Sequence, residues 1–318
     1  MSGNHHHGHG HGHARNHGHA HHHGPAPTGG HNRAFAIGVV LNSAFVVVEA
    51  TFGFLSGSMA LVADAGHNLS DVLSLLIAWG ATALATRPPS ARFTYGYKSS
   101  SILAALSNAA LLFIALGAIT VETVRRLITP EPVAGGTVVA VALVGIAINT
   151  ATALMFMRGR HTDINIRGAF LHMAGDAAVS AGVVIAGLLI QRTGALWIDP
   201  VASLLIVGVI AGSTWGLFKD SLKMGLLGVP NGIDQTKVRD FLAGQPGVSA
   251  VHDLHIWPMS TTETALTAHL VMLGGCPGDV FLHELAHELE HDFGIGHTTV
   301  QVEREADASC ALASDAVV

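Results

Sequence analysis

Residues 59–86 read MALVADAGHNLSDVLSLLIAWGATALAT, an apolar stretch that nonetheless carries Asp64, His67 and Asp71. A helix needs about 20 residues to cross roughly 30 Å of hydrocarbon, so this stretch is long enough to span a bilayer. One Asp near the bilayer centre costs about 2.5–3.5 kcal/mol on insertion scales. Packing alone is therefore a poor explanation for these polar residues.

A second apolar stretch, residues 166–190, carries His172 and Asp176 at the same four-residue spacing that separates His67 from Asp71. Side chains at this spacing share one helix face, with Cβ atoms about 5–6 Å apart. Two imidazoles and two carboxylates form a four-coordinate set that suits Zn²⁺ and related ions. The sequence therefore predicts that these four residues form a metal site near the middle of the membrane.

Other interpretations of the polar residues remain open. Each His/Asp pair on its own helix could be a self-satisfied polar pair inside the bundle, but two matching pairs at matching depth favour a shared metal site. Asp64 lies one turn outward from His67. It could attract the ion, or it could form a structural hydrogen bond.

Composition points to a membrane protein. The chain of 318 residues is 49% hydrophobic and only 12% charged, with a mean hydropathy of +0.46, whereas soluble proteins carry about 25% charged residues. The net charge of -6 excludes nucleic acid as an expected partner. Apolar stretches run over 34–55, 59–86, 99–127, 133–157, 166–190 and 197–218. We expect residues 34–218 to form six transmembrane helices.

Basic residues indicate the orientation in the membrane. Most Lys and Arg residues lie in segments on the same side as the amino terminus, whereas the other side holds only Arg125, Arg126 and Arg192. Cytoplasmic loops carry the excess of positive charge. Both termini are therefore expected in the cytosol.

Histidines crowd the amino-terminal segment, where more than half of the 22 histidines fall within the first 31 residues. A His/Gly/Ala/Asn composition cannot build a core but can hold divalent ions loosely. We expect residues 1–33 to be a disordered cytosolic tail that buffers metal. A purification tag is the alternative.

The last part of the chain has the pattern of a small soluble domain. Residues 219–232 are expected to be a linker, 233–305 a cytosolic domain for metal binding and dimerisation, and 306–318 a flexible tail. Periodicity predicts helices at 233–245 and 279–293, and strands at 248–257, 263–273 and 297–303. Such a set makes an α+β sandwich.

Five motifs match a known family. They are SGSMALVADAGHNLSD (56–71), RFTYGY (92–97), HMAGD (172–176), HDLHIW (252–257) and HTTVQVE (297–303). Over residues 34–305 the chain resembles the cation diffusion facilitators, particularly the bacterial cobalt-zinc-cadmium resistance branch and its zinc transporter relatives.

The resemblance implies a homodimer with six helices per subunit in a lipid bilayer, here the bacterial inner membrane. A cytosolic, ferredoxin-like or metallochaperone-like domain follows the helices. The implied function is proton-coupled export of a divalent metal from the cytosol by a secondary active transporter, not an enzyme. His67 in the first ligand position favours zinc, with cobalt and cadmium as alternatives. Zinc is expected as transported and regulatory ion, with no cofactor.

For the cytosolic domain the resemblance implies a regulatory zinc site at His252, His269 and Glu303. His297 is a further candidate ligand, and His255 also lies on a predicted strand. Two departures from relatives are visible. Residues 87–98 lack the His, Asp and Glu residues of a second loop site, and Ser101 stands where many relatives have an acidic residue.

Two rival functions come from other features. His283 to His287 read HELAH, the HExxH signature of zinc metalloproteases, in which two histidines hold zinc and the glutamate acts as base. A membrane-embedded protease is therefore one alternative, although a charged amphipathic helix favours a solvated surface. A metal-storing membrane sensor is the other.

Overall fold

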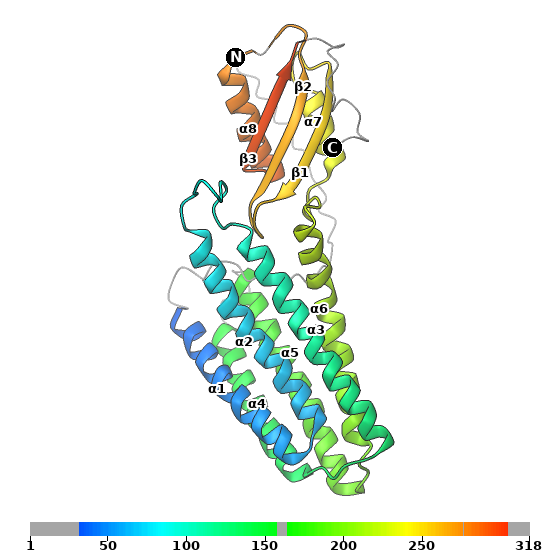
Figure 1. The fold of residues 1–318 in the computed structure, drawn as a ribbon. Coiled ribbons are helices and arrows are strands. Elements are labelled where there is room, and N and C mark those ends of the chain that lie inside the picture. The colour runs from blue at the N-terminus through cyan, green and yellow to red at the C-terminus, as the bar shows by residue number, and fades with distance from the viewer. Residues whose placement is uncertain (1–31, 158–163, 276, 305–318) are drawn as a thin grey trace, which may run out of the picture.

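The computed structural model describes residues 32–157, 164–275 and 277–304 (Figure 1). Six long helices come first, and a small domain of two helices and three strands follows. The long helices are α1 (Asn32–Ser56), α2 (Met59–Ala85), α3 (Ser100–Ile128), α4 (Gly135–Phe156), α5 (Ile164–Thr193) and α6 (Ile198–Gly225). Residues 1–31 of the expected His-rich tail and the expected flexible tail at 306–318 lie outside the described residues.

The six expected membrane helices are confirmed as helices. Within the described residues, α2 to α6 are long and apolar enough to cross a membrane, and α1 contributes the shorter apolar helix Val40–Ser56. Large apolar side chains such as Ile114, Val121 and Leu205 are exposed on the outer faces of the bundle. Lipid tails would cover such a surface.

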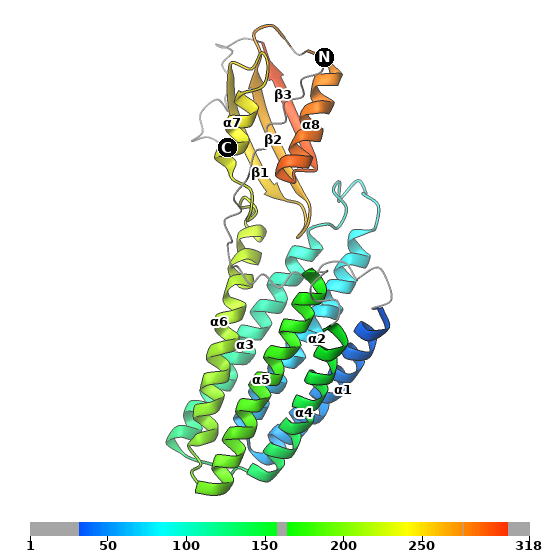
Figure 2. The same ribbon diagram turned by 180° about the vertical axis from the view of Figure 1, so that it is seen from behind.

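Helices α2 and α5 lie between two pairs of helices (Figures 1 and 2). In both views α3 and α6 stand on one side of the bundle and α1 and α4 on the other (Figures 1 and 2). A single apolar core receives side chains from all six helices, namely Phe45, Leu61, Leu116, Val138, Val183 and Ile210. The two helices that carry the His/Asp pairs are therefore held by neighbours on both sides.

The start of α2 is fixed by contacts with other segments of the same chain. Gly57 has a φ of +69°, and a Cβ at this position would lie 2.7 Å from the carbonyl oxygen of Pro132, so only glycine fits the α1–α2 turn. Asp199 of α6 accepts hydrogen bonds from the Ser58 hydroxyl and, at 2.7 Å, from the backbone N–H of Met59. An aspartate of one helix thus caps another and ties α2 to α6.

The C-terminal domain has the element order that the sequence predicts. Its elements are α7 (Gln235–Ala243), β1 (Ala250–Pro258), β2 (Thr264–Val271), α8 (Asp279–Phe293) and β3 (His297–Glu303). Strand β2 is central, antiparallel to β1 and parallel to β3. Helices α7 and α8 cover one face of the sheet (Figure 2), and no described element covers the other (Figure 1).

Helix α6 is longer than expected. The sequence places the helix end near 218 and a linker at 219–232, but α6 continues to Gly225. Polar residues such as Lys219 and Lys223 mark the membrane edge rather than the helix end, because Lys is a good helix former. The chain leaves the helix at Leu227, which has a φ of 60°.

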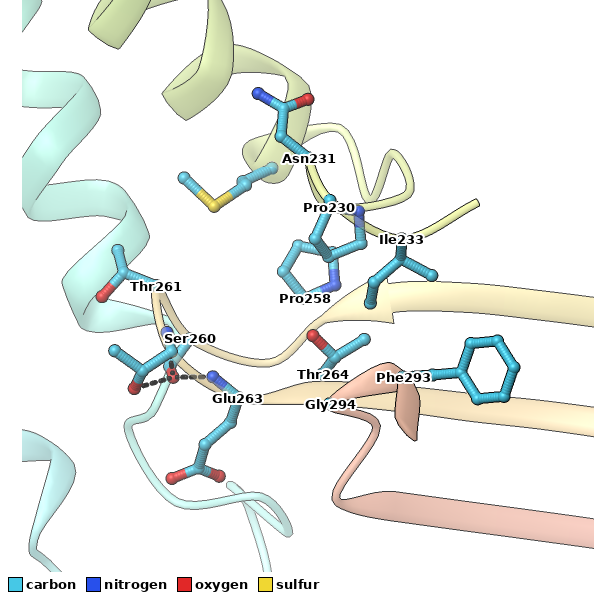
Figure 3. A pocket seen from close by; sticks show the side chains of 13 residues that line it. Pro230, Asn231, Ile233, Pro258, Ser260, Thr261, Glu263, Thr264, Phe293 and Gly294 are labelled. Atoms are coloured by element: carbon cyan, nitrogen blue, oxygen red, sulfur yellow. Dashed lines mark hydrogen bonds between the residues drawn. The ribbon is translucent and has the colours of Figure 1, made fainter. Parts of the chain in front are cut away.

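The C-terminal domain contacts the start of α3 through the β1–β2 turn. Lys98 forms an ion pair with Glu263, the Ser99 hydroxyl donates to the carbonyl oxygen of Met259 at 3.2 Å, and the N–H of Thr261 donates to Ser101 Oγ at 3.1 Å. A cavity of about 310 Å³ lies beside this turn, between the end of α6, residues 230–233 and the end of α8 (Figure 3). These contacts seat the domain on the bundle.

Candidate metal centres

The four polar residues predicted from α2 and α5 meet in a ring in which His and Asp alternate. His67 Nε2 lies 3.6 Å from Asp71 Oδ2 and 3.5 Å from Asp176 Oδ1. His172 Nε2 lies 3.2 Å from Asp71 Oδ2 and 3.7 Å from Asp176 Oδ2. Each imidazole therefore faces both carboxylates. We call these four residues the membrane ring.

The His-to-Asp spacing of the membrane ring is close to that in a tetrahedral zinc site. Four donors that each lie about 2.0–2.1 Å from a tetrahedral Zn²⁺ are separated from one another by roughly 3.3–3.4 Å. The four His-to-Asp distances in the ring are 3.2 to 3.7 Å. His67, Asp71 and Asp176 offer ligand atoms that all lie within 4.8 Å of one another, whereas the rings of His67 and His172 have centroids 6.0 Å apart. His172 would therefore have to move toward the other three side chains to complete a four-ligand site.

The two halves of the membrane ring differ in exposure. His172 and Asp71 form the half nearer the C-terminal domain, because α2 runs toward that domain and α5 runs away from it (Figure 1). In that half the Asp71 side chain is 30% exposed, whereas in the other half Asp176 is 5% exposed. The two most exposed side chains of the ring, Asp71 at 30% and His172 at 23%, thus lie in the half nearer the C-terminal domain.

Asp64 lies outside the membrane ring, one helical turn farther from the C-terminal domain than His67. Its Oδ2 accepts a hydrogen bond of 2.9 Å from the hydroxyl of Ser180 on α5. Its carboxyl group also contacts that of Glu49 on α1, which accepts a 2.9 Å hydrogen bond from the amide of Asn68. These side chains are buried, so a polar cluster closes the less accessible side of the ring.

A second group lies on the open face of the C-terminal sheet. His252 of β1 stands directly opposite His269 of β2, so their side chains share one face. His252 Nε2 lies 3.3 Å from Glu303 Oε2, and His269 Nδ1 lies 2.9 Å from Glu303 Oε1. Each of the three side chains is 12% exposed. We call them the sheet cluster; two imidazoles and a carboxylate can hold a zinc ion.

The other histidines named for this domain lie elsewhere. His297 pairs with Ala265 at the far end of β3, six residues and roughly 20 Å along the strand from Glu303, where its ring meets Tyr95 edge-on. His255 is 41% exposed and pairs with Asp253 at 2.9 Å. The structure therefore brings neither histidine into the sheet cluster.

The HExxH sequence lies on the solvent side of α8. His283, Glu284 and His287 are exposed, while Leu285 and Leu289 of the same helix are buried in the core. Among the described residues, the groups of His and acidic side chains close enough to share an ion are found in the membrane and on the sheet, not on this helix.

Two residues of these sites were not singled out from the sequence. Glu49 is the one acidic residue in the first apolar stretch, and an ionisable residue in a membrane helix is by itself a sign of function. Asp253 contacts both His255 and His269. In a regular strand it would point to the opposite face from His252, so its position depends on an irregularity of β1.

Both parts of the chain match known families. Residues 35–224 match the cation efflux transmembrane domain, and residues 230–305 match the cytoplasmic domain of cation efflux proteins. Among solved structures, the metal-bound C-terminal domain of the CzcD transporter from Cupriavidus metallidurans is similar at 36% identity. The match covers 22% of this chain and 99% of the solved chain, with a TM-score of 0.21.

Similar full-length proteins are transporters. The cadmium, cobalt and zinc/H(+)-K(+) antiporter of Bacillus subtilis is 35% identical, covering 87% of this chain and 91% of the relative. The metal cation efflux system protein CzcD of Cupriavidus metallidurans is 36% identical over 88% and 90%, and the zinc transporter ZitB of Escherichia coli is 36% identical over 85% and 86%. The chain therefore belongs to the cation efflux family.

Proposed function

We propose that this protein is a secondary active transporter that exports zinc, with cobalt and cadmium as related substrates, through the membrane ring in exchange for protons. The observation that carries this proposal is the alternating ring of His67, Asp71, His172 and Asp176. Its two imidazoles and two carboxylates are ligand types that suit an ion of charge +2 such as Zn²⁺, and its His-to-Asp distances are 3.2 to 3.7 Å. The relatives named as zinc, cobalt and cadmium transporters support the same class of substrate.

The donor set favours zinc over the abundant alkaline-earth ions. Ca²⁺ takes six to eight oxygen ligands, and Mg²⁺ demands octahedral geometry and keeps several waters. The membrane ring offers two imidazole nitrogens and two carboxylates as its ligands. Binding Mg²⁺ or Ca²⁺ would leave their preferred coordination incomplete, so the ring discriminates by number and type of ligand.

Accessibility supports a direction for the movement. The half of the ring that faces the C-terminal domain is the more exposed half, and the other side is closed by the buried cluster around Asp64 and Glu49. An ion would therefore load from the side of the C-terminal domain and leave on the opposite side after α2 and α5 change their relative position. We place both termini on the cytosolic side of a bacterial inner membrane, so this direction is export.

Proton exchange follows from the chemistry of the same four residues. An imidazole binds metal only when it is neutral, and a carboxylate binds metal only when it is ionised. Metal binding therefore requires that protons leave the ring, and protons that arrive from the far side displace the ion. The antiporter relative from Bacillus subtilis supports this coupling.

The sheet cluster is proposed as a regulatory zinc site in a homodimer. Its three donors come from three strands of a sheet, so they are preorganised, and His252 and His269 meet edge-on with ring centroids 5.1 Å apart. No described element of the chain covers this face of the sheet, which leaves it available to the second copy in the dimer. An ion bound here would connect cytosolic zinc concentration to the geometry of the domain.

A flux assay with the purified protein tests the proposal. Reconstituted in sealed vesicles, the wild-type protein should accumulate Zn²⁺, and Co²⁺ or Cd²⁺ should compete while a large excess of Mg²⁺ should not. The Asp176→Ala variant, purified and reconstituted in the same way, is the control for leak. Binding of zinc without any accumulation would instead favour the metal-storing sensor, because storage does not require ligands in the middle of a membrane.

A further inference from the structure

Strand β1 contains a bulge next to the sheet cluster. His252 pairs with His269 and His255 pairs with Thr267, so β1 advances three residues while β2 advances two. The extra residue lets Asp253 take a φ of 49°, one of two positive values among the described non-glycine residues. Asp is one of the few residue types that tolerate this left-handed conformation, and bulges commonly re-aim a side chain.

The bulge changes the face on which Asp253 lies. In a regular strand it would point away from His252 and into the apolar core of Leu254, Leu266 and Leu270. Instead its Oδ2 lies 3.4 Å from His269 Nε2 and its Oδ1 lies 2.9 Å from His255 Nε2. The carboxylate is 11% exposed and therefore largely shielded from solvent.

His269 thus has a carboxylate at each ring nitrogen. Its Nδ1 faces Glu303 Oε1 at 2.9 Å, inside the sheet cluster, and its Nε2 faces Asp253 Oδ2 at 3.4 Å, outside it. A metal-binding histidine normally gives one nitrogen to the ion and donates the N–H of the other to a carboxylate or carbonyl, which fixes its tautomer and orientation.

We propose that Asp253 is the positioning residue of the regulatory metal site: its carboxylate accepts the Nε2–H of His269 and so directs Nδ1 of His269 toward the ion. This inference rests on the proposed site at His252, His269 and Glu303. It explains why β1 keeps a bulge and an unfavourable backbone conformation at this point. His255 holds the second oxygen of Asp253 and limits rotation of the carboxylate.

Zinc binding tests this role in a background that combines Asp176→Ala with deletion of residues 2–31, which removes both the membrane site and the His-rich segment. Asp253→Asn keeps a residue type that tolerates the left-handed backbone conformation, but it removes the negative charge. Asp253→Gly allows that conformation without strain and removes the side-chain acceptor. Both are expected to weaken zinc binding at the sheet by about 10–100-fold. In the absence of metal, Asp253→Gly should unfold at a temperature no lower than that of the protein with Asp253. Weaker zinc binding by this variant would then reflect loss of positioning and not loss of folding.

Controls distinguish the possible outcomes. Asp292→Asn removes the charge from a similar contact, His291 Nδ1 to Asp292 Oδ1 at 2.7 Å, on the exposed face of α8, and should leave zinc affinity unchanged. The absorption spectrum of bound Co²⁺ reports the ligand set, which should be retained in Asp253→Asn and altered in His269→Ala. Unchanged zinc affinity in both Asp253 variants, or a Co²⁺ spectrum altered as in His269→Ala, would overturn the positioning role. Unchanged binding in His269→Ala would overturn the site itself.

Discussion

Asp71 Oδ2 on α2 lies 3.2 Å from His172 Nε2 on α5, and this is the shortest His-to-Asp contact in the membrane ring. The contacts within each helix, His67 to Asp71 and His172 to Asp176, are longer at 3.6 and 3.7 Å. The ring is therefore closed by contacts between helices, not only by the four-residue spacing within them. A shift of α2 against α5 that lengthens these contacts between helices would open the ring.

Removal of one carboxylate should abolish transport. Asp71→Ala or Asp176→Ala leaves three donors and one negative charge for an ion of charge +2. We expect zinc flux in vesicles to fall to the leak level, while yield, helix content and dimerisation remain as in the wild type. Glu290→Ala, a change of an exposed acidic residue on α8, is the matched control. Wild-type flux in either ring variant would exclude the proposed site.

The first histidine of the ring should set the selectivity. His67→Asp exchanges a nitrogen donor for a third carboxylate, and a harder, more negative donor set accepts a wider range of ions. Competition assays should show increased Cd²⁺ or Mn²⁺ transport relative to Zn²⁺. The control variant His287→Asp, on the exposed face of α8, should leave the order of preference among transported ions unchanged. Equal transport of Mg²⁺ and Zn²⁺ by the wild-type protein would contradict the coordination argument.

Glu284 should be dispensable. It is exposed on α8 in a surface HExxH sequence, and its side chain contributes nothing to the core of the domain. We expect Glu284→Gln to retain zinc export within the error of the assay, since a surface Glu-to-Gln change usually alters stability by less than about 0.5 kcal/mol. Peptide cleavage by the wild-type protein that disappears together with export in this variant would restore the protease interpretation.

Asp199 should matter for stability rather than selectivity. Asp199→Ala leaves the buried N–H of Met59 and the Ser58 hydroxyl without their acceptor, which costs about 1–3 kcal/mol for each orphaned group. We expect thermal unfolding of the purified protein at a lower temperature, with the order of transported ions unchanged. Asp199→Asn keeps one acceptor oxygen and should lose less. Equal unfolding temperatures for all three proteins would show that the cap contributes little.

The sequence was sufficient for the elements and for placing each His/Asp pair on one helix face, because both depend on local periodicity. An apolar stretch of membrane length is unambiguous, and a four-residue spacing places His67 and Asp71 on one face of any helix. The order of helices and strands in the C-terminal domain was predictable for the same reason. The end of α6 was not, because charged residues signal the membrane surface and say little about where a helix stops.

The features that the sequence did not reveal depend on contacts between distant segments. Asp64 could be weighed as a ligand, but its hydrogen bond to Ser180 and its contact with Glu49 require the packing of three helices. His297 is a suitable residue type for a metal ligand, yet the register of β2 and β3 puts it at the opposite end of its strand from Glu303. The position of Asp253 depends on a bulge that no residue pattern in β1 announces.

Zinc flux into sealed vesicles under an imposed pH gradient, at fixed membrane potential, tests the central claim most directly. Protons and metal compete for the ring because an imidazole binds metal only when it is neutral and a carboxylate only when it is ionised. We predict that acidifying the compartment that receives zinc accelerates uptake, that proton movement accompanies zinc in the opposite direction, and that Asp71→Ala abolishes both. Zinc uptake that is equally fast with and without the gradient would contradict exchange of metal for protons at the membrane ring.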